Sequence, residues 1–212
     1  MQLIGMLDSP YVRRVAIALQ LLGLRFEHNP LSVFRTFDQF SAINPVVKAP
    51  TLVCDDGTVL MDSTLILEYA QALAGPRRRL LPDAVPELQH ALRLEGLALA
   101  ACEKSVQIVY EQQLRPTEKQ HAPWIDRVTA QTLAAYGALE QEVARRAPST
   151  AQNAIDRAGV AAAVAWHFTQ ALLPGLVDPQ RHPALAALSA RAEALPEFQA
   201  APHGDGTCRA PA

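Results

Sequence analysis

Hydrophobic and polar positions follow two different patterns along this chain. In the first 75 residues, short apolar runs alternate with amphipathic stretches. From about residue 87 onward, apolar residues recur only at three- and four-residue spacing, which is the period of a helix. The pattern predicts strands mixed with helices first, and helices alone afterwards.

The chain opens with an apolar run at residues 2–6, which predicts a short buried strand. A helix is expected from Pro10 to about Leu22, because apolar residues then follow at helical spacing and Gly23 ends the pattern. Arg13 and Arg14 fall off this apolar stripe. Ser9 stands where an N-cap is expected, directly before a proline at the first helical position.

Residues 25–31 predict a second strand, parallel to the first because a helix connects them. Residues 32–42 are ambiguous and fit a loop with a short helix. Two apolar runs, at 46–54 and 59–61, flank an Asp-Asp-Gly turn and predict a hairpin. Pro50 suits an edge, a first position or a bulge, and a cis bond is an option there. Another helix is expected from Asp62-Ser63-Thr64 to Gly75.

The second half predicts helices at about 87–114, 123–146, 155–172 and 183–194. Asn153 and Asp156 have the spacing of a capping box. We therefore expect an N-terminal α/β domain at 1–75, a linker at 76–86, an all-helical domain at 87–200 and a flexible tail at 201–212. The tail is expected because apolar residues are few and Gly and Pro recur.

Composition narrows the class of protein further. The 212 residues carry a formal net charge of −2, and the longest basic run is the arginine triplet at 77–79, which argues against a nucleic-acid or membrane partner. The three cysteines lie far apart, with no spacing typical of a metal site or a disulfide framework. Because no cluster has metal-ligand spacing, we expect no metal. We find no signal peptide or membrane span, so a cytoplasmic protein is expected.

The start of the first helix is the strongest candidate for chemistry. Its first N–H groups and its dipole favour an anion, and the Ser9 hydroxyl there could donate to a thiolate. The alternative is that Ser9 is only a helix cap, as Ser commonly is. In the same way, Asp62 and Ser63 could cap the later helix, hold a ligand carboxylate, or do both. Lys48 could be an ordinary solvated lysine.

Four motifs in order resemble the glutathione S-transferase superfamily: Ser9-Pro10-Tyr11-Val12-Arg13, residues 44–50, Asp62-Ser63, and Asn153 with Asp156. The likeness covers the chain apart from its tail. The first motif looks most like serine-type bacterial members related to the beta, theta and zeta classes. The resemblance implies a thioredoxin-like N-terminal domain followed by an all-α C-terminal domain, with glutathione as co-substrate.

What the resemblance implies for single residues is specific. Ser9 matches the hydroxyl that steadies the glutathione thiolate. Lys48 matches a contact of the glycine carboxylate, and Ala49, before a cis Pro50, pairs its backbone with the cysteinyl part. Asp62 and Ser63 match the pair that holds the γ-glutamyl end.

Val47 and Ala49 depart from the residues that are commoner in the family at those positions. Glycine and a β-branched residue are the usual occupants there. The change matters little if only backbone contacts are made.

The resemblance also implies a small, mostly apolar electrophile, of the kind met in detoxification, and a homodimer. A cleft for this second substrate could be lined by the residues Leu7, Tyr11, Glu103, Gln107 and Tyr110, although packing explains the last three as well. Tyr11 is an alternative to Ser9 as the thiolate stabiliser. Two other functions stay open: a non-catalytic protein that binds a partner or a hydrophobic ligand, and a glutathione-dependent isomerase or dehalogenase.

Overall fold

The computed structural model describes residues 1–76, 78–151 and 154–209. Arg77 of the arginine triplet and Asn153 of the expected capping box lie outside them. The described chain forms two compact units, and the boundary between them falls after Leu80. The first unit comprises Met1–Leu80 together with the chain from Ala194 onward, and the second comprises Leu81–Glu193.

The first unit contains a four-stranded sheet in the order β2-β1-β3-β4. Its strands are β1 (Gln2–Ile4), β2 (Glu27–Asn29), β3 (Thr51–Val53) and β4 (Val59–Leu60). β1 runs parallel to β2 and antiparallel to β3, and β4 is antiparallel to β3. The βαβ unit and the hairpin predicted from the sequence are confirmed.

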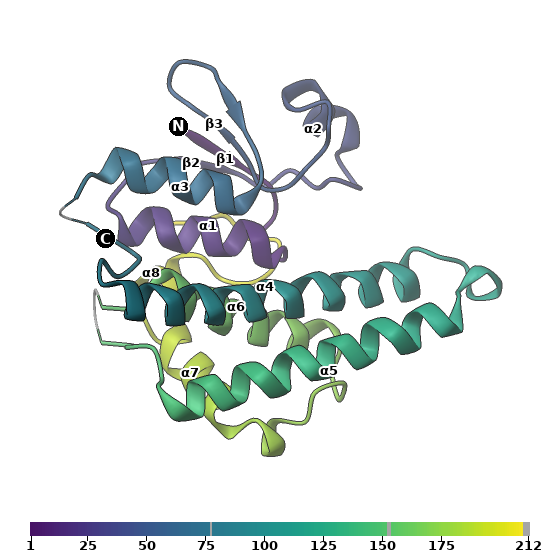
Figure 1. Cartoon of the computed structure of the whole chain (residues 1–212). Helices are drawn as coiled ribbons and strands as arrows, with labels where there is room; N and C mark the ends of the chain where they lie inside the picture. Colours follow the sequence, from purple (N-terminus) through teal and green to yellow (C-terminus); the bar gives the residue numbers. More distant parts are fainter. Residues whose placement is uncertain (77, 152–153, 210–212) are drawn as a thin grey trace. The chain divides into compact units, whose positions relative to one another are not determined.

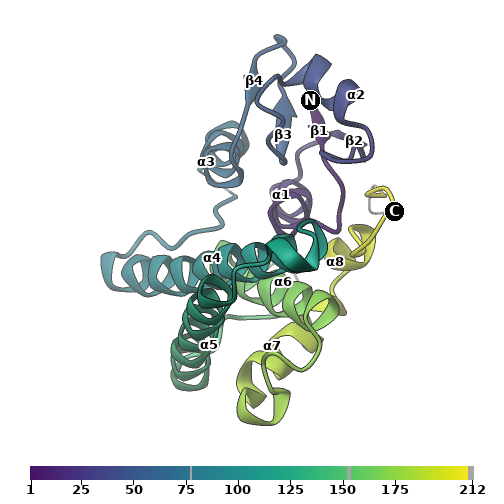
Figure 2. The same cartoon turned by 90° about the vertical axis from the view of Figure 1, so that its right-hand side faces the viewer.

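Helices α1 (Pro10–Leu21) and α3 (Ser63–Ala74) pack side by side on this sheet, and the short α2 (Phe37–Ile43) lies apart from them (Figures 1 and 2). The stretch at 32–42 is a loop that leads into the short helix α2, as the sequence indicates. This βαβαββα order is the thioredoxin-like arrangement that the sequence predicts.

The periodicity predicts that Arg13 and Arg14 lie on an exposed polar face of the helix. In the structure both side chains are instead buried, at 1% and 2% exposed. The Arg13 Nε donates to the carbonyl of Ala201 at 2.8 Å, and the Arg14 Nη1 donates to the Ser63 hydroxyl oxygen at 3.1 Å. Both arginines are buried because they satisfy backbone and side-chain acceptors on neighbouring elements of the same unit. Helix α1 is therefore covered on its polar face as well.

The first unit is completed by α8 (Pro196–Ala200), a helix that the periodicity does not predict. It packs on α1, where the Arg13 guanidinium lies over the Phe198 ring, 5.7 Å from its centroid. The sequence placed residues 194–200 in the helical domain, whereas their packing puts them with the sheet. The following backbone is also engaged, since the Arg209 N–H donates to the carbonyl of Ala200.

The second unit is all helical. Its helices are α4 (Val85–Gln113), α5 (Ala122–Arg145), α6 (Arg157–Leu172) and α7 (Pro183–Glu193). α4 packs on α5 and α6, and α6 packs on α7. One cluster of its core is formed by Ile108, Val109, Val128, Phe168 and Leu173. The four predicted helices are thus present, with bounds shifted by one or two residues.

Asp156 has a different role in the structure from the one that the capping box predicts. It is itself the N-cap of α6, and its carboxylate accepts the Gly159 N–H at 2.7 Å. The helix therefore begins at Arg157, directly after Asp156, rather than at about residue 155 as the sequence predicts.

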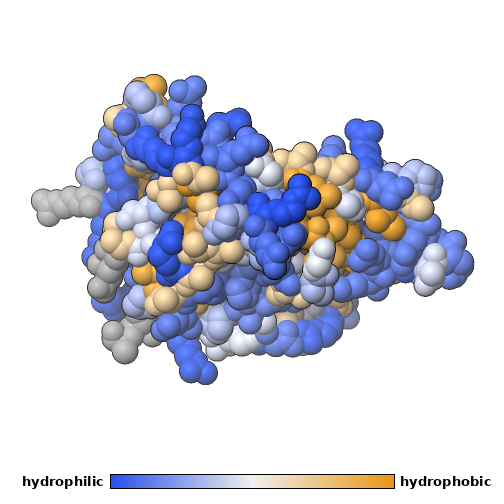
Figure 3. Space-filling model, turned by 90° about the horizontal axis from the view of Figure 1, so that it is seen from below, coloured by the Kyte–Doolittle hydropathy of each residue, from blue (hydrophilic) through white to orange (hydrophobic). Residues whose placement is uncertain are grey.

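Figure 3 shows patches of hydrophobic residues among hydrophilic ones on one face. No helix in the described part of the chain is both long enough and apolar enough to cross a bilayer.

Candidate functional site

The register of the sheet brings three loops to one of its ends. Ile4, the last residue of β1, pairs with Thr51, the first residue of β3, and Leu52 pairs with Leu60, the last residue of β4. The loop after β1, the loop before β3 and the loop after β4 therefore leave the sheet at the same end. These loops carry the predicted site residues of the first unit, namely Ser9, Lys48, Ala49, Pro50, Asp62 and Ser63.

Ser9 is the N-cap of α1, as the sequence predicts. Its hydroxyl oxygen accepts the Val12 N–H at 3.4 Å, near the long limit of a hydrogen bond, and its own N–H donates to the carbonyl of Met6 at 3.2 Å. The side chain is half-buried. A weak capping bond leaves this hydroxyl able to turn toward a ligand at the positive end of α1.

Two buried polar residues hold the loop that carries Lys48 and Ala49 through hydrogen bonds. Asn44 donates from Nδ2 to the Thr51 hydroxyl at 2.8 Å, and that hydroxyl donates to the carbonyl of Lys48 at 2.6 Å. The peptide bond from Ala49 to Pro50 is cis, as the resemblance implies. Asn44 begins the motif at 44–50, but the sequence assigned no supporting role to Asn44 or Thr51, although an Asn-Pro pair is typical of such a turn.

Val47 is one of the two residues that depart from the family pattern, and its backbone conformation explains why glycine suits this position. Its φ of 53° lies in the left-handed region, which glycine adopts without strain and which β-branched residues disfavour. The resemblance implies that glycine is commoner at this position, and the φ of Val47 gives the conformational reason.

Asp62 and Ser63 form the start of α3. Asp62 is the exposed N-cap, and its Oδ1 accepts the N–H groups of Thr64 at 2.9 Å and Leu65 at 3.4 Å. Ser63 is 3% exposed and its hydroxyl accepts from Arg14. The capping role of Asp62 predicted from the sequence is confirmed, and Arg14 is a supporting residue that the periodicity missed.

Electrostatics at the start of α1 are set by two carboxylates. Burial, and then the negative charge of Asp205, raise the pKa of Asp8, while backbone hydrogen bonds and Arg35 act in the opposite direction. Arg35 pairs with Asp205 at 3.2 Å. Residues from the end of the chain therefore influence the charge beside Ser9.

The residues predicted to line a second-substrate cleft come from both units. Leu7 and Tyr11 lie in the first unit, and Glu103, Gln107 and Tyr110 lie on α4 of the second. Within α4, the Gln107 amide donates to the Glu103 carboxylate at 2.8 Å, one turn away. The cleft stays a prediction.

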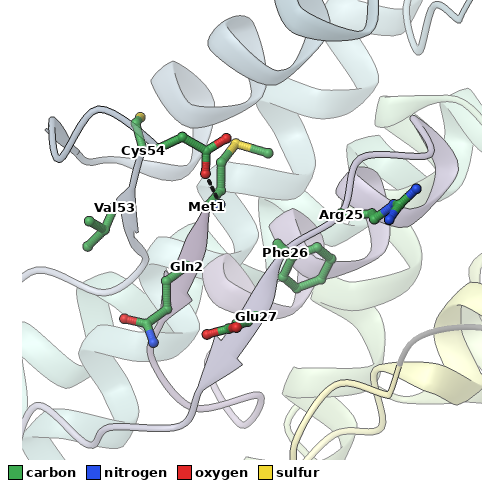
Figure 4. Close-up of a pocket in the computed structure, with 8 residues that line it drawn as sticks. Met1, Gln2, Arg25, Phe26, Glu27, Val53 and Cys54 are labelled. Atoms are coloured by element: carbon green, nitrogen blue, oxygen red, sulfur yellow. Dashed lines mark hydrogen bonds and ion pairs between the residues drawn. The ribbon is translucent and has the colours of Figure 1, made fainter.

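An open hollow of about 500 Å³ lies at the opposite end of β1 from Ser9 (Figure 4). It is lined by Met1, Gln2, Arg25, Phe26, Glu27, Val53, Cys54 and Asp55. The N-terminal ammonium pairs with the Asp55 carboxylate there. Its position separates this hollow from the three converging loops.

The comparisons agree with the two-unit architecture. The glutathione S-transferase N-terminal domain family matches residues 3–78. A crystal structure of a glutathione S-transferase from Methylobacterium radiotolerans, in complex with glutathione sulfonate, superposes with a TM-score of 0.83 at 28% identity, covering 93% of this chain and 92% of that one.

A glutathione transferase family member from Pseudomonas fluorescens Pf-5, with bound S-(propanoic acid)-glutathione, is 30% identical with a TM-score of 0.77, covering 95% of this chain and 98% of that one. The uncharacterized GST-like protein YibF of Escherichia coli K12 is 31% identical over 120 residues, which are 57% of this chain and 58% of YibF, less than two thirds of its length.

The fold is thus that of a thioredoxin-like domain followed by an all-helical domain. The chain belongs to the glutathione S-transferase superfamily.

Proposed function

We propose that this chain binds glutathione at the three converging loops and activates its thiol with Ser9 for attack on a small, mostly apolar electrophile. The observation that carries the proposal is the convergence of the α1 start, the cis-proline loop and the α3 start at one end of the sheet. Bound glutathione derivatives in two similar crystal structures support the same ligand.

In this proposal each loop holds one part of the tripeptide. The exposed Lys48 pairs with the glycine carboxylate, and the backbone of Ala49 pairs with the cysteinyl part as an added strand would. The α3 start binds the γ-glutamyl end through the hydroxyl and N–H of Ser63, because Asp62 already accepts the N–H groups of Thr64 and Leu65. Arg14 donates to the Ser63 hydroxyl oxygen, so the hydroxyl proton is directed away from Arg14 and toward an acceptor.

Ser9 supplies the chemistry. A thiol has an ordinary pKa of about 8.5, and each unit by which a site lowers it corresponds to about 1.4 kcal/mol. The Ser9 hydroxyl can donate to the sulfur anion, and the N-terminal end of α1 adds a favourable field. The thiolate then attacks the electrophilic carbon, and the carbon's leaving group departs with the bonding electron pair. We expect a homodimer, as the resemblance implies.

The test measures the pKa of the bound glutathione thiol from its ultraviolet absorbance, with the affinity from calorimetry. In Ser9→Ala we expect glutathione still to bind, but with its thiol pKa returned toward about 8.5 and conjugation of a chloro-aromatic substrate reduced at least about tenfold. Tyr11→Phe is the matched control and should keep a lowered thiol pKa. Stability of Ser9→Ala should fall by less than about 1 kcal/mol, because the capping bond that it loses is long.

The outcomes separate the alternatives. Loss of the lowered pKa in Tyr11→Phe, and not in Ser9→Ala, would assign the role to Tyr11. Absence of glutathione binding by the unmodified protein would overturn the proposal and favour a non-catalytic protein that binds a partner or a hydrophobic ligand. Binding without conjugation would favour isomerisation or dehalogenation.

A further inference from the structure

His28 joins three separate parts of the first unit. It lies on β2, and its Nε2 is 2.7 Å from the carbonyl oxygen of Gly5, at the start of the loop that leads to Ser9. Its Nδ1 accepts the backbone N–H of Cys208 at 2.9 Å. One imidazole thus connects the sheet, the Ser9 loop and the segment near the end of the chain.

The two partners determine the protonation state of this ring. The backbone N–H of Cys208 can only donate, so Nδ1 must carry a lone pair. The Gly5 carbonyl can only accept, so Nε2 must carry the proton. The neutral Nε2–H tautomer satisfies both, whereas a second proton on Nδ1 would point at the Cys208 N–H and abolish that bond.

The segment at residues 201–209, here called the strap, has further contacts beside the same loop. Arg35 pairs with the Asp205 carboxylate at 3.2 Å, and its guanidinium also lies 3.2 Å from the Met6 sulfur. The backbone carbonyl of Met6 accepts the Ser9 N–H. The strap therefore lies along the residues that place Ser9 at the start of α1.

The ionisable groups around His28 have different titration ranges. Asp8, Asp205 and Arg35 lie on the Ser9 loop, the strap and the loop after β2, and Cys208 on the strap has a thiol pKa raised to about 11 by burial. A carboxylate ordinarily titrates near pH 4 and an arginine not at all in this range, whereas an imidazole titrates near 6.5. His28 therefore carries an imidazole that can change charge just below neutral pH. The strap itself carries a second imidazole, His203, and the pKa of Asp8 is raised by burial. The variant His28→Gln leaves both of these groups in place and so separates the contribution of His28 from theirs.

We propose that His28 is a positioning residue that, in its neutral form, holds the strap against the loop that precedes Ser9, and that protonation of His28 releases the strap. The strap is thereby a working part of the first unit. Its release on acidification is a property of this unit alone and does not depend on the proposed function.

The sign of the pH dependence follows from the burial of His28. Burial lowers its pKa below 6.5 and outweighs the opposite effect of the Gly5 carbonyl, whereas in a released strap the ring regains the ordinary value. Closure is therefore fully favourable above about pH 6.5 and weakens as the pH falls from there to the lowered pKa. Each unit between the two values increases opening about tenfold.

Thiol labelling of the unmodified chain tests the proposal. Cys208 is half-buried in the strap, whereas Cys54 and Cys102 are buried, one in each unit, and report on global unfolding. The protein is pulsed with 4,4′-dithiodipyridine, which also reacts with thiols in acid, from about pH 7.5 to about pH 5. Peptide mass spectrometry then gives the rate at each cysteine, divided by that of free cysteine at the same pH.

We expect the relative rate at Cys208 to rise on acidification while Cys54 and Cys102 stay protected. His28→Gln is the matched rescue variant, because its amide can donate to Gly5 and accept from Cys208 without titrating; its relative rate should stay low at every pH. His28→Phe should be labelled rapidly at every pH. A pH-independent rate in the unmodified protein, or slow labelling of His28→Phe, would overturn the proposal.

Catalysis gives a second readout, which rests on the proposed function. The pH profile of kcat/KM should show an inflection in the unmodified protein that is absent in His28→Gln, after allowance for the thiol itself. Labelling is done without glutathione, so a strap that opens in a protein that fails to bind glutathione would overturn the proposed function only. A strap that does not open in a protein that binds glutathione would overturn this inference only.

Discussion

At the scale of single residues, Val47 shows a conflict between side chain and backbone. Left-handed backbone costs an L-residue about 1–2 kcal/mol, and Val47 adopts it within the loop that carries Lys48 and Ala49. The neighbouring Val46 is 63% exposed and does not have a positive φ. The two valines therefore form a matched pair for measuring this cost.

We predict that Val47→Gly leaves the free energy of unfolding unchanged or raises it by up to about 1 kcal/mol, because relief of the left-handed strain offsets the entropy lost by glycine. Val46→Gly, which relieves nothing, should lower it by about 0.5–1 kcal/mol. Urea denaturation of both variants measures the difference. A larger loss in Val47→Gly than in Val46→Gly would contradict the assignment of strain to Val47.

Sequence reasoning finds residues whose role is local and misses those whose role depends on distant partners. The N-cap positions of Ser9 and Asp62 follow from their neighbours in the chain, and the structure contains both caps. Arg14 and His28 have no local signal, because their partners Ser63 and Cys208 lie 49 and 180 residues away. Periodicity predicts that a charged residue lies outside the core, because it contains no information about a distant residue that could bind the charged group inside the core.

At the scale of elements, Gly5 is where β1, α1 and the cis-proline loop meet. Its φ is +133°, and a Cβ built there would lie 2.6 Å from a Val12 methyl and 3.2 Å from the Ala49 Cβ. Gly57, in the turn between β3 and β4, also has a positive φ of +85°, but open space surrounds it within 4 Å. Of these two glycines, Gly5 is required by packing as well as by backbone conformation, and Gly57 by backbone conformation alone.

We predict that Gly5→Ala lowers the free energy of unfolding by about 2–4 kcal/mol, since it combines strained backbone with a steric clash. Gly57→Ala should cost about 1–2 kcal/mol, from the backbone alone. Chemical denaturation provides both values, and calorimetry shows whether glutathione affinity falls in Gly5→Ala. Equal losses in the two variants would mean that the Val12 contact adjusts without cost.

The elements themselves are largely predictable, and their exceptions are informative. The hairpin around Gly57 and the long helices of the second unit have strong local signals, and the structure contains them. Helix α8 is five residues long, too short for a periodic pattern to be distinguished from a loop. Its position depends on Arg13, far away in the sequence.

At the scale of the whole molecule, the first unit is built from both ends of the chain. Phe198 of α8 is fully buried and lies against Arg13 of α1. Phe37 of α2, in the same unit, is 52% exposed. The sequence predicted a boundary between the α/β and helical parts but gave no sign that the chain returns to the first part, because nothing local marks such a return.

We predict that Phe198→Ala lowers the free energy of unfolding by about 3–5 kcal/mol, as expected for a fully buried aromatic side chain. Phe37→Ala should change it by less than about 1 kcal/mol. Thermal and urea denaturation of the two variants test this difference. A small loss in Phe198→Ala would mean that the unit is stable without the returning segment.

The packing of α8 on α1 also has a consequence for folding during synthesis of the protein. The ribosome makes β1 and α1 at the beginning of synthesis and residues 196–200 near the end, with the whole second unit between them. While the helical unit is being translated, the guanidinium of Arg13 can contact neither the Phe198 ring nor the Ala201 carbonyl, because these residues have not yet been made. The unit whose translation begins first is therefore the unit that is completed last.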